Sequence, residues 1–139
     1  MTVYRGRIHL NTTGNMDMSD ITGLVNGIVA DSGINIGTCH VFNVGSTGII
    51  GAIEFEPGLE RDFPEMLHKL IPPSREYGHE IAWHDGNGHS HLHASMVGPE
   101  ITVPVEKGRL CCGIWQQIFH YEADNKARSR EIIVTVTGE

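Results

Sequence analysis

The chain has 139 residues, 40% of them hydrophobic and 19% charged, and its formal net charge is −7. These values predict a single folded domain over residues 1–139 and exclude a disordered chain. The acidic balance disfavours nucleic acid and anionic membranes as partners, because both attract positive charge. No apolar run approaches the ~20 residues that cross a bilayer, and no signal-peptide pattern begins the chain. Three cysteines fit reduced thiols, so we expect a cytoplasmic protein with no membrane partner.

The first half of the chain predicts strands separated by a helix. Residues 2–12 alternate weakly between apolar and polar positions, as in a strand. Residues 21–29 place apolar side chains at helical spacing, and Gly33 is a suitable helix end. Residues 34–42 and 49–55 then show the period of two that is typical of strands.

A second amphipathic helix is predicted at residues 59–70, where apolar side chains recur every three or four positions. Pro64 suits the first turn of that helix, and Pro72-Pro73 ends it.

The C-terminal part of the chain predicts strands alone. Residues 101–105 alternate, residues 106–108 form a turn, and a long strand is expected from 109 to 121. A polar hairpin around 124–125 leads to the last strand, 131–137. Strands, two helices and then more strands predict an α+β, β-rich domain or a sandwich, and not a repeat of βαβ units.

The stretch His84–His93 is the densest group of chemically active side chains. It holds four of the nine histidines, with Asp85 and Asn87 between glycines. Histidine binds transition metals and transfers protons near neutral pH. Imidazole and carboxylate together suit a divalent metal, although the HExxH spacing of zinc proteases is absent.

Two conformations of this stretch are possible, and they group the histidines differently. An extended chain would place His89, His91 and His93 on one face. A helix that begins near Gly88 would place His89 and His93 together and turn His91 elsewhere. The helix is favoured, and either conformation brings two imidazoles close to each other.

Two further polar positions interrupt apolar strand faces. Glu54 shares a strand face with Ile50 and Ala52, so it is either a functional carboxylate or a solvated residue at the strand end. Gln116 and Gln117 lie in an apolar run, and one of the two amides must point inward and find a hydrogen-bond partner.

A short glycine-flanked loop, Gly45-Ser46-Thr47-Gly48, has the composition of a phosphate-binding loop. Backbone amides and two hydroxyl groups can approach an anion there. The glycines on either side of Asn87 allow the same approach.

Taken together, these motifs resemble the YjbQ family, also called UPF0047 or secondary thiamine-phosphate synthase. The resemblance spans the chain and is closest to its archaeal-type branch. It is carried by residues 85–95, Gly98-Pro99, 108–110, 113–117 and 132–139.

The resemblance implies a compact, jelly-roll-like β-sandwich with two or three flanking helices that assembles as a homotrimer. It also implies weak thiamine-phosphate synthase activity, in which a pyrimidine diphosphate joins a thiazole phosphate and pyrophosphate leaves. Two alternatives remain open: a non-catalytic homotrimer that binds a metal or small ligand, and a metal-dependent phosphoester hydrolase.

The family's functional positions fall on Glu54, Asp85, Asn87, His91 and Gln116. We therefore expect one site for a small phosphorylated molecule, while His84 and His93 receive no role. The expected catalytic residues are Glu54, Asp85 and His91. The expected substrate-binding residues are Ser46, Thr47, Asn87 and Gln116. The expected ligands of a divalent metal, Zn or Mg, are Asp85, His89 and His91.

Overall fold

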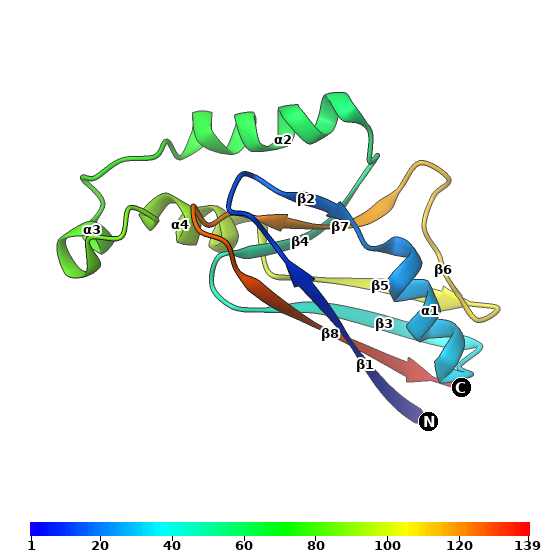
Figure 1. The fold of residues 1–139 in the computed structure, drawn as a ribbon. Helices are drawn as coiled ribbons and strands as arrows, with labels where there is room; N and C mark the ends of the chain where they lie inside the picture. The colour runs from blue at the N-terminus through cyan, green and yellow to red at the C-terminus, as the bar shows by residue number, and fades with distance from the viewer.

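Two antiparallel sheets form the framework of the computed structural model, which describes residues 1–139 (Figure 1). The larger sheet has the strand order β1 (Thr2–Asn11), β8 (Ser129–Gly138), β3 (Ile36–Val44), β5 (Glu100–Glu106) and β6 (Arg109–Leu110). The smaller sheet has the order β2 (Met18–Asp20), β7 (Gln117–Glu122) and β4 (Gly48–Ile53). All strand pairs are antiparallel.

Four helices lie around these sheets. They are α1 (Thr22–Ser32), α2 (Pro57–Leu70), α3 (Gly78–Trp83) and α4 (Gly88–Val97). Figure 1 places α1 at the end of the molecule that holds both termini, whereas α3 and α4 lie at the opposite end. No helix has the length and apolar content that crossing a membrane requires.

The main core lies between α1 and the five-stranded sheet. Val25 and Val29 of α1 pack in one cluster with alternate residues of β3 and β8, including Val41, Val134 and Val136, and all five are fully buried. Full burial of one such side chain contributes roughly 1.5–3 kcal/mol. The alternating apolar side chains of the strands and the apolar face of α1 therefore pack into one layer.

A smaller core supports the other end of the molecule. It joins Leu67 of α2 and Ala94 of α4 to residues of β4 and β7. Phe63 adds edge-to-face contacts with Phe119 and Tyr121. This cluster fixes α2 and α4 on the smaller sheet and so sets the position of the histidine-rich helix.

Most predicted elements are confirmed, with shifts of a few residues at their ends. The α+β, β-rich class is confirmed, and the number of helices is four. Gly33 ends α1 in the left-handed conformation, with φ of 68°. Residues from Gly88 form a helix, the favoured of the two conformations.

Two expectations about secondary structure are wrong, and one short strand was not expected. The long strand expected from 109 to 121 is interrupted by a turn between Gly113 and Gln116. In this turn the backbone N–H of Gln116 donates to the Gly113 carbonyl at 2.9 Å. Pro64 lies inside α2, and Pro57 occupies its first turn. The short strand β2 was not expected, since three residues are too few to show a period.

Candidate functional site

A polar cavity of about 330 Å³ lies where α4 meets the β3–β4 loop and the β7–β8 connection. No hydrophobic residue lines it. Its lining residues are Gly45, Ser46, Thr47, Asp85, Asn87, His91, Asp124, Arg128 and Arg130. Three segments far apart in the sequence therefore build one site.

Gly45 allows a guanidinium group to approach the loop after β3. Its φ is +133°, and a Cβ at this position would lie 2.8 Å from Nη1 of Arg130. The Asn43 side-chain amide donates to the Gly45 carbonyl at 3.2 Å and so holds the loop. Glycine is required here by both backbone conformation and space.

Asp124 is the hydrogen-bonding centre of the cavity. It accepts hydrogen bonds from Thr47 Oγ1 at 3.0 Å, from Arg128 Nε and Nη2 at 3.0 and 2.8 Å, and from Asn87 Nδ2 at 3.4 Å. Burial acts to raise the pKa of this carboxyl, but the bonds from Arg128, Thr47 and Asn87 prevail and lower it. Asp124 is therefore ionised at neutral pH and holds the three segments together.

A buried ion pair between Arg130 and Glu122 holds Thr47 in position. Arg130 Nη2 donates to Thr47 Oγ1 at 2.7 Å, and Thr12 Oγ1 donates to Glu122 Oε1 at 2.7 Å. Both charged side chains are almost completely buried, so each depends on the other for compensation. Thr47 thus receives one hydrogen bond from Arg130 and gives another to Asp124.

Glu80 of α3 fixes the loop that carries Asp85 and Asn87. Its carboxylate accepts the backbone N–H of Gly86 at 2.7 Å and of Gly88 at 3.1 Å. Burial acts to raise the pKa of Glu80, but these amides and the Arg75 guanidinium together lower it. An ionised carboxylate that binds two amides of one loop determines the conformation of that loop.

His79 and His91 flank the acidic side of the cavity. His79 Nε2 lies 2.8 Å from Asn87 Oδ1 and 3.1 Å from Asp85 Oδ1. The rings of His79 and His91 have centroids 4.5 Å apart. Burial and the neighbouring His79 lower the pKa of His91, so His91 is neutral near pH 7 and can accept or donate a proton.

The structure brings five of the predicted site residues into this cavity. They are Ser46, Thr47, Asp85, Asn87 and His91. Helix α4 explains why His91 lines the cavity and His89 and His93 do not. His91 and Asn87 are four residues apart and therefore share a face of the helix.

Three predicted residues do not lie in this cavity. Glu54 is exposed just after β4 ends, which corresponds to the solvated alternative. Gln116 is also exposed, and its side chain accepts the Gly113 N–H at 3.0 Å. His89 faces α2, away from His91, so the expected metal-ligand set of Asp85, His89 and His91 is not assembled.

The sequence interpretation missed His79, Asp124, Arg128 and Arg130. Arg130 could have been found, because it shares the period-two face of Ile132, Val134 and Val136 and is therefore turned toward the interior. An arginine on a buried face requires an acidic partner. The others gave no signal, since Asp124 and Arg128 have the composition of a solvated hairpin.

The side chains fit a divalent metal poorly in their present positions. No group of three or more histidine, cysteine, aspartate or glutamate side chains converges as a metal ion would require. The chemistry of the cavity is therefore derived from its own donors, acceptors and charges.

Two curled antiparallel sheets with helices at both ends define a mixed α+β class of protein, and a charged cavity lies beside α4. The chain belongs to the family described as UPF0047 protein YjbQ-like, which matches residues 6–139. The resemblance inferred from the sequence motifs is thus confirmed.

Relatives and solved structures agree over almost the whole chain. A UPF0047 protein of Methanothermobacter thermautotrophicus is 39% identical over 139 residues, which is 100% of this chain and 95% of the relative. The Bacillus subtilis UPF0047 protein YugU is 30% identical over 94% of this chain and 97% of its own length. A crystal structure from Sulfolobus solfataricus, described as a YbjQ-like protein of unknown function, has a TM-score of 0.94 and 38% identity, with 99% of both chains covered.

Proposed function

We propose that the cavity binds a small phosphorylated molecule and that the chain is a thiamine-phosphate synthase-like transferase. The observation that carries this proposal is a pair of adjoining cavities. The polar one shares Gly45, Ser46 and His91 with a second cavity of about 260 Å³, which Ala94 and Pro99 also line. A charged compartment beside a less polar one suits phosphate groups joined to an organic ring.

Two guanidinium groups have donors free for an anion. Arg128 uses Nε and Nη2 on Asp124, which leaves Nη1 for a ligand. Arg130 uses Nε and Nη2 on Glu122 and Thr47, and its Nη1 lies beside Gly45. Together with the Ser46 hydroxyl, these groups can bind phosphate oxygens despite the acidic charge of the whole chain.

The proposed reaction forms a bond from the thiazole nitrogen to the pyrimidine methylene carbon. The bond from that carbon to the diphosphate oxygen breaks, and pyrophosphate leaves with the electron pair. The attacking nitrogen loses no proton, so the site must stabilise the leaving group and exclude water. Arg128 and neutral His91 donate to the departing oxygens, and the Asp85 carboxylate stabilises positive charge on the methylene carbon.

The test is a steady-state assay with hydroxymethylpyrimidine diphosphate and thiazole phosphate, in which thiamine phosphate is measured by its fluorescent oxidation product. Loss of one donor to developing charge lowers kcat about 100-fold or more, so we expect that loss for His91→Ala. The matched control is His84→Asn, which changes an exposed histidine outside the cavity at φ 56°, a conformation that asparagine tolerates. Unchanged activity in His91→Ala would refute the assignment. Release of phosphate from either substrate without transfer would favour the hydrolase.

We propose in addition that the chain acts as a homotrimer in the cytoplasm, where its three unpaired cysteines remain reduced. Large apolar side chains at the surface support self-association, among them the adjacent Ile114 and Trp115, which are 82% and 69% exposed. Light scattering of the purified chain tests this proposal. A trimer that Trp115→Ser dissociates is expected, and a monomeric wild type would contradict it.

A further inference from the structure

Three histidines outside the polar cavity form a second cluster between α2 and α4. His89 and His93 are four residues apart on α4, and His68 lies opposite them on α2. The ring centroids are 5.4 Å apart for His89 and His93, 5.6 Å for His68 and His93, and 6.0 Å for His68 and His89. From the sequence, His89 was expected to bind a metal with Asp85 and His91, and His93 received no role.

The spacing is that of imidazoles around one ion. With Zn–N bonds of about 2.0–2.1 Å, two imidazoles on a tetrahedral ion have ring centres on the order of 5 Å apart. The ring nitrogens in their present orientation do not converge on one point. Because χ2 of histidine is a broad torsion, rotation of the His68 and His89 rings redirects their nitrogens, while His93 keeps its contact with the Ile71 carbonyl.

Two ring nitrogens of the cluster are buried and have no hydrogen-bond partner. They are Nδ1 of His89 and Nδ1 of His93, on side chains that are 6% and 0% exposed. Buried polar atoms without a partner are rare and costly, so these atoms indicate a missing ligand. Water alone would satisfy them only where the space is polar enough.

His93 has the second contact that metal-binding histidines usually make. Its Nε2 lies 2.8 Å from the Ile71 carbonyl oxygen, so Nε2 carries the proton and Nδ1 carries the lone pair. A backbone carbonyl in this position fixes the tautomer of a metal ligand.

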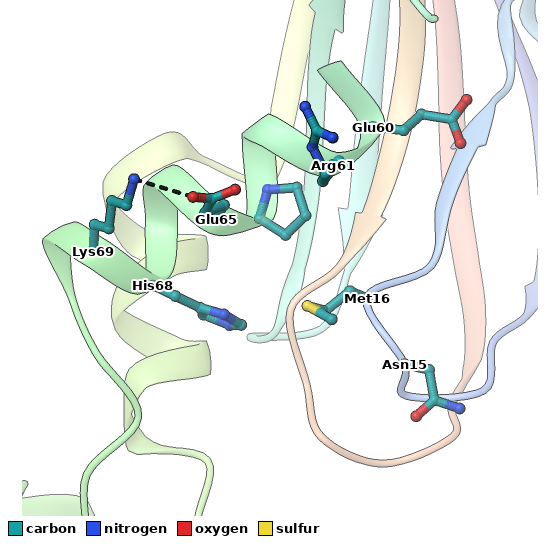
Figure 2. Close-up of a pocket in the computed structure, with 8 residues that line it drawn as sticks. Asn15, Met16, Glu60, Arg61, Glu65, His68 and Lys69 are labelled. Carbon is teal, nitrogen blue, oxygen red and sulfur yellow. Dashed lines mark ion pairs between the residues drawn. The ribbon is translucent and has the colours of Figure 1, made fainter. Parts of the chain in front are cut away.

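A groove on the surface reaches one member of the cluster, His68. The groove, of about 510 Å³, runs between α2 and the Asn15–Met16 turn, and His68 lines it. Figure 2 shows His68 reaching from α2 toward the side of the groove where Met16 lies, while the Lys69–Glu65 ion pair (dashed line) spans the same turn of the helix. His68 is only half-buried, so it is the member of the cluster that solvent can contact.

We propose that His68, His89 and His93 bind a divalent transition-metal ion such as Zn²⁺, with water from the groove as a fourth ligand. The site is separate from the polar cavity, because His91 points to the opposite face of α4. It is also independent of the proposed transferase activity. Its role is to tie α2 to α4.

The experiment titrates tag-free, chelator-treated protein at pH 7.5 with Zn²⁺ by calorimetry and with Co²⁺ by visible absorption. We expect one ion per chain, an intense tetrahedral Co²⁺ spectrum, and a rise in Tm with Zn²⁺. His68→Ala should weaken Zn²⁺ binding about 100-fold or more and abolish the Tm rise. This half-buried position can be truncated without opening the core, and circular dichroism verifies the fold.

Two control variants make the result decisive. His84→Asn should bind Zn²⁺ as the wild type does, and so should His91→Ala, which removes the histidine of the polar cavity. No binding of Zn²⁺ up to 1 mM (on the order of the weakest specific affinities) would overturn the proposal. Equal affinity in His68→Ala and wild type would overturn it as well. Binding lost in His91→Ala but kept in His68→Ala would place the ion in the polar cavity instead.

Discussion

The two faces of α4 carry the same residue type in opposite environments. On one face, His91 lines a cavity in which direct hydrogen bonds connect Asp124, Thr47 and Arg130. On the other, His89 and His93 lie against α2 with ring nitrogens that have no partner. The comparison teaches that one helix can present a face to a charged, hydrogen-bonded cavity and the opposite face to a cluster of imidazoles. The following predictions test that contrast, beginning with the largest effect.

The largest loss of stability is expected when the buried ion pair of the cavity, Arg130 with Glu122, is broken. Arg130→Met leaves the Glu122 carboxylate buried without its partner and removes the support of Thr47, which should cost about 3–5 kcal/mol of unfolding free energy in urea. The double variant Arg130→Met, Glu122→Gln should be less destabilised than the single one. Equal losses would show that the unpaired charge is not the cause.

A second effect concerns His120, which supports the cavity loop through Asn43. His120 Nε2 lies 3.0 Å from Asn43 Oδ1, and burial lowers its pKa to about 4. Arg130 opposes its charge, whereas Glu122 and Asp17 favour it. The unfolded chain takes up this proton near pH 6.5, before the folded protein does, so the stabilisation is complete above pH 6.5 and is lost as the pH falls toward 4.

The loss from this one group should amount to about 3 kcal/mol between pH 6.5 and 4, measured by urea unfolding at each pH. His120→Gln keeps a donor but cannot titrate, so its stability should vary less over this range. His9→Gln changes an exposed histidine and should follow the wild type. A His120→Gln curve parallel to the wild type would contradict the assignment.

A smaller effect is expected at the loop that presents Asp85 and Asn87. Glu80→Gln removes the charge that binds two loop amides, and should cost roughly 1–3 kcal/mol. Hydrogen exchange of the Gly86 and Gly88 amides should accelerate. Glu76→Gln, an exposed neighbour, serves as the control and should change neither quantity.

The smallest effect is expected at His84, which precedes α4 and belongs to neither of its faces. It is exposed and forms the left-handed end of α3. His84→Asn should change the unfolding free energy by no more than about 0.5 kcal/mol, because asparagine tolerates that conformation. A larger change would mean that this histidine has a contact that neither face accounts for.

Much of the fold could be predicted from the sequence because period and spacing are local properties. The apolar alternation of β8 and the helical spacing of α1 identified both elements, and Gly33 marked a helix end. The break after β6 was not predictable, since it depends on a turn between Gly113 and Gln116 that satisfies its own hydrogen bonds. The apolar composition of this segment predicted a continuous strand, whereas the turn makes part of it a loop.

The candidate site was predictable only in part. The residue group Asp85, Asn87 and His91 was identified because it is concentrated in one stretch of the sequence. Asp124, Arg128 and Arg130 come from a segment more than thirty residues further along the chain, and no local pattern connects them to that stretch. Glu54 and Gln116 illustrate the converse, because polar residues in apolar runs were assigned to a site from which tertiary structure separates them.

The place of β8 in the sheet has a consequence for the order of folding. β8 is the last strand in the chain, yet it pairs with both β1 and β3, as in the alignment of Val134 with Gly6 and with Val41. During synthesis, β1 therefore has no sheet partner until almost the whole chain has been made. Such long-range closure makes folding slow, and it leaves the edges of β1 and β3 exposed to other chains in the interval. The two arginines of the cavity arrive with this same segment, so the binding site and the sheet are completed in one late step.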